Sequence, residues 1–168
     1  VCSERPLPEL TEADISGDFW VMLEGIEDPY NFGYCLRSLY AAGASGIIVP
    51  PRNWMSAAGV VCRASAGASE LFRIFVADSA AAAKLFRRKG FAVLAADKTK
   101  DAVSIYDADI KRPLLLIVGG EKRGITQAAL AECDSVVCLD YGREFPAALS
   151  AASAASIIAF EIFRRGRK

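Results

Sequence analysis

The sequence predicts an α/β protein built on a mostly parallel sheet with helices on both faces. Short runs of β-branched and aliphatic residues alternate with Ala-rich stretches along the chain, and a glycine turn follows one of these runs. Continuous apolar runs are typical of strands that are buried on both faces. Their alternation with helices is typical of βαβ units, which place the strands parallel to one another.

Each element is predicted from its own residues, in chain order. The expected strands, rich in Val, Ile, Leu and Phe, are Phe19 to Leu23, Gly46 to Val49, Arg73 to Val76, Phe91 to Ala95, Leu114 to Val118 and Ser135 to Leu139. The expected helices, richer in Ala and in charged residues, are Asn31 to Ala42, roughly Ser56 to Ser65, Asp78 to Lys89, Thr126 to Ala131 and Ala147 to Arg165. Residues 1–17, which contain Pro6 and Pro8, are expected to be a linker or the remnant of an N-terminal extension, and residues 18–168 a single domain.

Composition restricts the class of protein. With 168 residues, 53% of them hydrophobic, the chain is expected to form one globular domain with its own core. No apolar run is long enough to span a membrane and the first residues do not resemble a secretion signal, so a cytoplasmic protein is predicted.

The cysteines and the absent histidine restrict the chemistry. The chain has five cysteines without a CxxC pair and no histidine, so we expect reduced thiols and no metal site. Catalytic triads and histidine bases are excluded, and any catalysis must use other side chains or the substrate itself.

Charge is spread unevenly. The chain is neutral overall, yet residues 1–30 carry eight acidic side chains against one basic side chain, which leaves a surplus of seven positive charges in the remainder. The basic residues gather at residues 84–89, at Lys122 with Arg123, and at residues 164–168, where they can attract a phosphate backbone. Solvated helix faces and helix ends that prefer cations explain the same pattern, and charge alone favours that second explanation.

The first candidate motif follows the first expected strand and reads DPYNFGYCLR, from Asp28 to Arg37. Asn31 can cap a helix, Gly33 allows another segment to approach closely, and Arg37 lies two turns into the helix, near the edge of the sheet where ligands bind. Taken singly, Arg37 reads as an exposed helix cation and Asn31 as an ordinary N-cap.

The second candidate motif is a buried strand that ends in a glycine turn, LLLIVGGEKRGI from Leu114 to Ile125. It matches neither GxGxxG nor the GxxxxGK[ST] pattern, so a dinucleotide or nucleoside triphosphate is not indicated. On its own, Glu121 also reads as an anion placed at the start of a helix, and the glycines read as plain turn residues.

In this order the segments resemble the SpoU/TrmH family of RNA 2′-O-ribose methyltransferases, within the SPOUT superfamily. The resemblance covers about residues 18–163 and rests on NFGxxxR at Asn31 to Arg37, GGExxG at Gly119 to Gly124, and a C-terminal helix of small residues that ends in Ala-Phe-Glu at Glu161. The segment ASAGA at Ala64 to Ala68 adds a fourth similarity.

The resemblance implies a fold, a cofactor and partners. The family fold is an α/β knot, in which the C-terminal segment passes through a loop to make a deep trefoil knot. It implies that S-adenosylmethionine binds bent in the knot, that the substrate is tRNA or rRNA, and that two copies of the chain form a homodimer which completes each active site. The residues that would contact the cofactor, largely through backbone groups, are Gly119, Gly120, Leu139, Tyr141 and Leu149.

The catalytic residues implied by the resemblance are Arg37, Asn31, Glu121 and Ser150. A cation such as Arg37 would favour the ionised form of a ribose 2′-hydroxyl and hold the adjacent phosphate, Asn31 would order the loop or the ribose, and Glu121 would position the glycine turn or the partner's arginine. The third motif departs from the family, which usually has Ser-Leu-Asn-Val-Ser: here Ser150 replaces the asparagine and Ala152 its partner serine. Ser150 keeps a single hydroxyl in place of an amide.

Two other interpretations remain open. The chain can be a non-catalytic member of the family that binds RNA or S-adenosylmethionine after its third motif has diverged. It can also be an unrelated doubly wound domain whose glycine turns bind an anionic metabolite.

Overall fold

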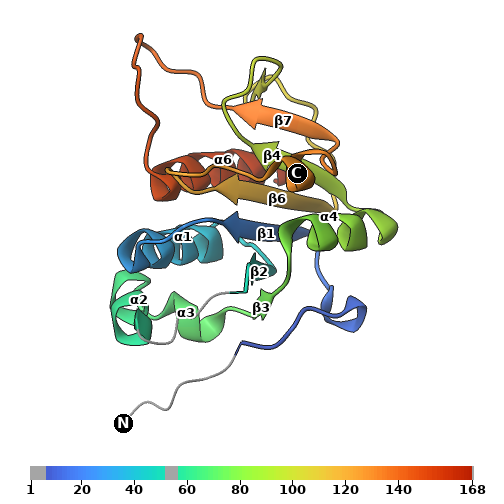
Figure 1. Ribbon diagram of the computed structural model, residues 1–168, viewed down its shortest axis with the longest axis vertical. Coiled ribbons are helices and arrows are strands. Elements are labelled where there is room, and N and C mark those ends of the chain that lie inside the picture. Colours follow the sequence, from blue (N-terminus) through green and yellow to red (C-terminus); the bar gives the residue numbers. More distant parts are fainter. Residues whose placement is uncertain (1–6, 52–56, 168) are drawn as a thin grey trace.

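The computed structural model describes residues 7–51 and 57–167, and these fold around one sheet of seven strands (Figure 1). The strand order is β3-β2-β1-β6-β4-β7-β5, and all neighbouring strands run parallel. The strands are β1 Phe19–Glu24, β2 Gly46–Val49, β3 Ile74–Val76, β4 Ala92–Ala96, β5 Val103–Ser104, β6 Leu114–Gly119 and β7 Ser135–Cys138. The prediction of a parallel sheet flanked by helices is confirmed.

The five predicted helices follow in the predicted order with different ends, and the structure adds a 3-10 turn and the short helix α3. The helical elements are a 3-10 turn Glu12–Asp14, α1 Pro29–Ala41, α2 Ala58–Ala64, α3 Ala68–Leu71, α4 Ser79–Arg88, α5 Gln127–Leu130 and α6 Ala151–Gly166. The predicted start at Ser56 lies outside the described residues. The last helix was expected from Ala147 and begins at Ala151 instead, because the Ser150 hydroxyl caps it by accepting a hydrogen bond from the Ser153 amide at 3.1 Å.

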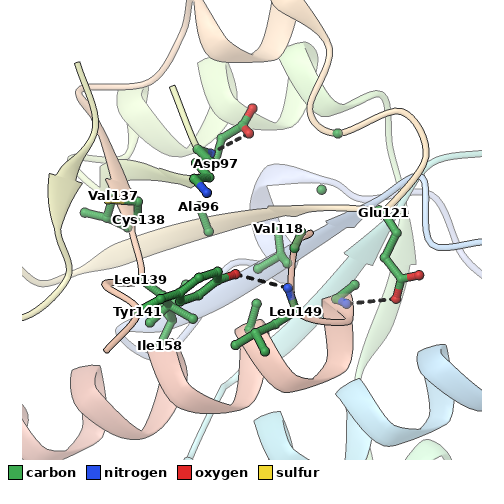
Figure 2. Close-up of a pocket in the computed structure, with 17 residues that line it drawn as sticks. Ala96, Asp97, Val118, Glu121, Val137, Cys138, Leu139, Tyr141, Leu149 and Ile158 are labelled. Atoms are coloured by element: carbon green, nitrogen blue, oxygen red, sulfur yellow. Dashed lines mark hydrogen bonds between the residues drawn. The ribbon is translucent and has the colours of Figure 1, made fainter. Parts of the chain in front are cut away.

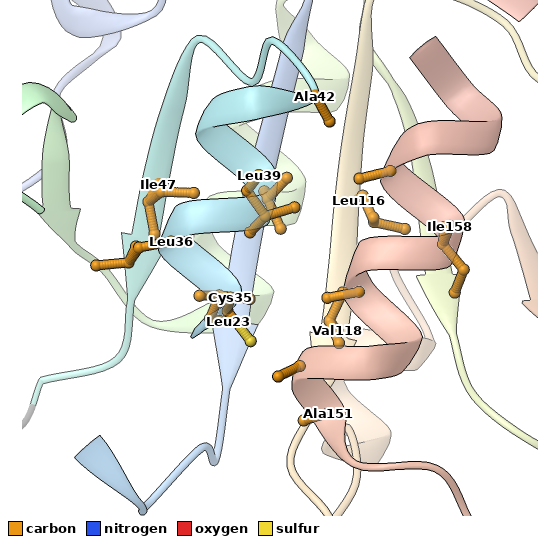
Figure 3. Packing of buried hydrophobic residues seen from close by; sticks show 14 of the residues in the cluster. Leu23, Cys35, Leu36, Leu39, Ala42, Ile47, Leu116, Val118, Ala151 and Ile158 are labelled. Atoms are coloured by element: carbon orange, nitrogen blue, oxygen red, sulfur yellow. The ribbon is translucent and has the colours of Figure 1, made fainter. Parts of the chain in front are cut away.

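Two hydrophobic clusters hold the helices against the two faces of the sheet. Along β1, Phe19, Val21 and Leu23 belong to the cluster under α1 and α6, whereas Trp20 and Met22 belong to the cluster under α4 and α5. Successive side chains of a strand point to opposite faces of the sheet, which explains this alternation. The side chains on both faces are buried because helices cover both faces. Figure 3 shows α1 and α6 side by side over the first cluster.

Close packing of α1 against α2 depends on a glycine. A Cβ atom added at Gly33 would lie only 2.5 Å from the Cβ of Ala64, so a larger residue would push α2 away. The expectation that Gly33 allows another segment to approach is therefore confirmed.

The topology gathers four strand ends at one edge. β6 lies between β1 and β4, and β7 lies beyond β4. The register pairs Glu24 with Gly119, and Ala96 with both Val118 and Val137, so the carboxyl ends of these strands are level. After β7 the chain extends away from the sheet and then returns to place α6 beside α1 (Figure 1).

The described part of the expected linker lies along the outer edge of the sheet. The Val76 amide donates to the Pro8 carbonyl at 2.8 Å, and the Leu10 amide donates to the Val76 carbonyl at 2.9 Å. The Arg73 guanidinium donates to the Ser16 hydroxyl at 2.7 Å. The division of the chain at residue 17 stays a prediction.

Candidate functional site

A pocket opens where the carboxyl ends of β4, β6 and β7 meet the first turns of α6 (Figure 2). Its empty volume is about 820 Å³, open solvent included. The lining residues are Ala96, Asp97, Lys98, Val118, Gly119, Gly120, Glu121, Gly124, Val137, Cys138, Leu139, Tyr141, Ala148, Leu149, Ala151, Ala154 and Ile158. All five residues predicted to contact a cofactor are among them, and the pocket lies at the edge where ligands bind parallel sheets.

The glycine turn after β6 forms one wall because side chains do not fit there. A Cβ at Gly119 would stand 2.6 Å from the backbone of Gly124, and a Cβ at Gly120 would run into the Gly25 carbonyl oxygen. The Gly120 amide donates to the Glu24 carbonyl at 2.7 Å, and the Gly124 amide donates to the Gly120 carbonyl at 2.9 Å. The turn is therefore fixed against β1 and presents bare backbone to the pocket.

The segment between β7 and α6 forms the opposite wall. The Tyr141 hydroxyl accepts a hydrogen bond from the Leu149 amide at 3.1 Å, which joins the start of this segment to its end. Lys98 places its ammonium group 5.3 Å from the centre of the Tyr141 ring, and the Phe145 ring lies 6.2 Å from it. Tyr141 thus holds the segment in a defined shape.

Glu121 joins three segments of the site. Its Oε1 accepts one hydrogen bond from the Asn31 side-chain amide at 3.1 Å and another from the Ala151 backbone amide at 3.2 Å. The glycine turn, the start of α1 and the start of α6 are consequently held together. The expectation that Glu121 positions the turn has a structural counterpart in these two bonds, while its catalytic role stays a prediction.

The helix cap at α1 differs from the expected one. Asp28 is the N-cap residue, its carboxylate accepting from the Asn31 backbone amide at 2.8 Å, and Pro29 occupies the first turn. The expectation that Asn31 caps the helix is wrong, because a helix with proline in its first turn starts earlier. The Asn31 side chain is thereby available for Glu121.

A smaller pocket of about 380 Å³, open solvent included, adjoins the first. It is lined by Gly25, Ile26, Glu27, Asp28, Asn31, Gly120, Glu121, Lys122 and Ala151. The two pockets share three lining residues, Gly120, Glu121 and Ala151. A group bound in the larger pocket would therefore face a group bound in the smaller pocket across these residues.

Two predicted catalytic residues lie outside the linings of these two pockets. The Ser150 hydroxyl caps α6 and also donates to the Ser153 hydroxyl at 3.0 Å. Arg37 is exposed on α1, and within residues 7–51 and 57–167 its guanidinium has no hydrogen bond or ion pair. It stands six residues after Asn31, which is about 9 Å along the helix and about 240° around it. The guanidinium therefore points away from the pocket of its own chain.

Thiol chemistry is disfavoured at Cys35, which is buried in the core under α1. Burial raises the pKa of the Cys35 thiol to about 12, so this side chain stays protonated near neutral pH. No set of three or more possible metal ligands gathers in the described segments, and none of the helices found there is long and apolar enough to cross a membrane.

Sequence reasoning missed part of the lining. Asp97 and Lys98 follow β4 directly, and the rule that ligands lie beyond the carboxyl ends of strands indicates that position as well. Neither residue belongs to a glycine-containing motif, so the motifs alone do not indicate them.

Comparisons with known proteins agree with the resemblance. The model of the SpoU rRNA methylase family matches residues 18–160. A relative from Shewanella oneidensis, the 23S rRNA (guanosine-2′-O-)-methyltransferase RlmB, is 32% identical over 168 residues, covering 99% of this chain and 67% of the relative. An uncharacterized tRNA/rRNA methyltransferase from Synechocystis is 29% identical, covering 86% of this chain and 38% of the relative.

Solved structures share the fold. An AdoMet-bound rRNA methyltransferase from Sinorhizobium meliloti superposes with a TM-score of 0.83 at 26% identity, covering 95% of this chain and 62% of that one. The SpoU methyltransferase AviRb from Streptomyces viridochromogenes, in complex with AdoMet, superposes with a TM-score of 0.81 at 24% identity, covering 95% and 65%. The chain therefore spans between 38 and 67% of the length of these four proteins.

Proposed function

Because the chain belongs to the SpoU rRNA methylase family, we propose that it transfers a methyl group from S-adenosylmethionine to a ribose 2′-hydroxyl of rRNA or tRNA. The observation that carries this proposal is the pair of adjoining pockets, which share Glu121 at their boundary. The larger pocket would hold the methyl donor and the smaller one the ribose.

The larger pocket fits S-adenosylmethionine. Its glycine turn exposes backbone without side chains, as a nucleoside bound through main-chain groups requires. Val118, Leu149 and Ile158 offer apolar surface for the adenine ring, and Asp97 and Glu121 supply carboxylates for its polar parts. When bound, S-adenosylmethionine supplies a methyl group on a sulfonium centre.

Asn31 and Glu121 would orient the ribose. Since the Asn31 amide nitrogen donates to Glu121, its carbonyl oxygen remains to accept a hydrogen bond in the smaller pocket. A ribose hydroxyl held there is oriented by a side chain that is itself fixed by Glu121. No histidine is needed, because the hydroxyl can be activated electrostatically.

Arg37 would act on the active site of a second copy of the chain. It projects from the same face of α1 as Tyr30 and Tyr34, which are 53% and 47% exposed, and it has no partner in the described part of its own chain. α6 lies beside α1 and exposes Ile157, 39%, and Phe160, 45%.

An exposed apolar face of this kind favours a homodimer, in which Arg37 reaches the partner's smaller pocket and stabilises the developing oxyanion. Phe163 is exposed as well, whereas Ile162 is buried in the core of its own chain and does not contribute to this face.

We also propose that the chain is knotted. After β7, which lies beyond β4, the chain returns to place α6 over the face of β1 and β6. The segment between β7 and α6 lines the pocket together with residues that follow β4 and β6, two strands that come earlier in the sequence. This arrangement supports the threaded C-terminus that the family resemblance implies.

Subunit complementation tests the activity and the shared site together. Arg37→Ala and Asn31→Ala subunits, each expected to be inactive with labelled S-adenosylmethionine and rRNA or tRNA, are mixed under conditions that allow exchange. Each mixed dimer then holds one intact site, so the mixture should recover about a quarter of the wild-type activity. Two Arg37→Ala preparations mixed together are the control.

Three outcomes would count against these proposals. No methyl transfer by the wild type together with no binding of S-adenosylmethionine in calorimetry would refute the proposed activity. Binding of the donor without transfer would favour a non-catalytic RNA-binding member of the family. Full activity of a monomer in sedimentation would overturn the dimer and the role of Arg37 across it.

A further inference from the structure

We propose that Asp97 recognises the ribose diol of the methyl donor and so selects adenosine cofactors with both hydroxyls. This inference rests on the proposed function, because it assigns a contact within the same pocket. Asp97 follows β4 directly and lines the pocket on the side opposite Tyr141 and Leu149 (Figure 2). The Asp97 carboxylate and the glycine turn after β6 lie together at the carboxyl edge of the sheet.

The position of Asp97 is fixed by its backbone and by its own side chain. The Asp97 amide donates to the Val137 carbonyl at 3.0 Å, which continues the pairing of β4 with β7. Its Oδ1 accepts a hydrogen bond from the Lys98 amide at 2.7 Å. Oδ2 stands 3.9 Å from the point where a Gly124 side chain would begin, so the carboxylate faces the glycine turn.

Asp97 has a carboxylate oxygen with unused hydrogen-bonding capacity toward a ligand, because its Oδ2 makes no hydrogen bond and no ion pair within the described residues. Glu121 also keeps one free oxygen among these residues, but its Oε1 receives donors from Asn31 and Ala151, and Glu121 stands at the boundary with the smaller pocket. Asp97 lines the larger pocket and not the smaller one. The neighbouring ammonium group of Lys98 lies over the Tyr141 ring. A half-buried carboxylate with a vacant oxygen accepts hydrogen bonds from a ligand that brings donors.

The donor that fits is a vicinal diol. A carboxylate beyond the end of a parallel strand binds ribose hydroxyls in dinucleotide-binding folds, because adjacent hydroxyls suit its acceptor oxygens. The adenine ring would pack on the apolar wall of Val118, Leu149 and Ile158, which lies apart from the Asp97 carboxylate (Figure 2). The ligand has two other donors, the ammonium of the methionine part and the amino group of adenine, and the experiment separates both from the diol.

The experiment is a cycle of protein variants against ligand variants in calorimetry. The ligands are S-adenosylhomocysteine, its 2′,3′-dideoxy analogue, and 5′-methylthioadenosine, which lacks the amino-acid part. For the wild type, removing both hydroxyls should weaken binding roughly tenfold to a hundredfold, as expected for hydrogen bonds to a charged group. Asp97→Ala should bind S-adenosylhomocysteine and 5′-methylthioadenosine more weakly than the wild type does, by a similar factor. Its affinity for the dideoxy analogue should equal that of the wild type.

Controls separate recognition from folding. Asp97→Asn keeps an acceptor for the Lys98 amide, so its unligated thermal unfolding should match the wild type while its affinity falls. Asp101→Asn changes the charge by the same amount at an exposed position outside the pocket lining and should bind as the wild type does.

The inference fails if Asp97→Ala binds S-adenosylhomocysteine as tightly as the wild type, or loses the same factor for the dideoxy analogue. It also fails if 5′-methylthioadenosine is unaffected, which would assign Asp97 to the ammonium. Absence of binding by the wild type would instead refute the proposed function.

Discussion

Replacing Glu121 with alanine should break two hydrogen bonds that join three segments of the site. The donors are the Asn31 side chain at 3.1 Å and the Ala151 backbone amide at 3.2 Å, and both converge on one carboxylate oxygen. Hydrogen bonds to charged groups contribute about 1.5–3 kcal/mol, and solvent reduces that range here because the Glu121 side chain is exposed. A value of about 1 kcal/mol for each bond gives about 2 kcal/mol for Glu121→Ala.

A double-mutant cycle separates the two bonds. Asn31→Ala removes only the first and should cost about 1 kcal/mol of unfolding free energy. The double variant should cost no more than Glu121→Ala alone, which corresponds to a coupling of about 1 kcal/mol between Asn31 and Glu121. Urea unfolding at pH 7 measures all three variants. Asp101→Ala, at an exposed position outside both pocket linings, is the carboxylate control and should unfold as the wild type does.

The same variants report on the pocket. Because Glu121 also fixes the start of α6, Glu121→Ala should weaken binding of S-adenosylhomocysteine more than Asn31→Ala does. A coupling near zero, or equal losses of affinity in the two single variants, would refute the reasoning that Glu121 joins α1 and α6 through separate bonds.

Two further predictions concern other parts of the fold. Glu161 is buried and accepts hydrogen bonds from Arg164 and Arg165, both at the end of α6, which lower its pKa from 4.5 to about 2. Since the pKa of Glu161 is lower in the folded chain than in the unfolded chain, ionised Glu161 adds to the free energy of unfolding. This contribution is complete above about pH 4.5 and is lost as the pH falls toward 2. Acid unfolding of wild type should therefore be steeper across that window than that of Glu161→Gln, and parallel curves would contradict the assignment. Tyr141→Phe removes the acceptor of the Leu149 amide. Losing this hydrogen bond, worth about 1 kcal/mol, should lower the affinity for S-adenosylhomocysteine about fivefold in calorimetry. Unchanged affinity would show that the bond does not shape the pocket wall between β7 and α6.

Much of the fold could be predicted from the sequence because its strands are apolar over their whole length. β1 and β6 are buried at nearly every position, so their runs of Phe, Val and Leu stand out without alternation. β5 and α3, with two and four residues, are too short to show any period, and they were missed.

The site could be predicted in part, since its glycine motifs are contiguous in sequence. The start of α1 was misplaced because Asp28 and Asn31 are both good caps, and only the position of Pro29 decides between them. Ser150 could not be understood from its motif alone, because its hydroxyl closes a cap with Ser153 that exists only once α6 begins at Ala151. Asp97 belongs to no motif, and its importance follows from the order of strands in the sheet.

The return of α6 explains why residues so far apart in sequence share one pocket. Its first turn is held by Glu121, which accepts from the Ala151 amide. Its last turn is held by Arg165, whose guanidinium donates to the carbonyl oxygens of Ala108 at 2.5 Å and Ile105 at 2.9 Å in the turn after β5.

Both ends of the helix are thus fastened to loops that begin at the carboxyl edge of the sheet. The segment between β7 and α6 must then cross that edge in front of β4 and β6. A ligand pocket at this edge follows from the path of the chain, and the side chains exposed there, Asp97 and Glu121 above all, decide what it binds.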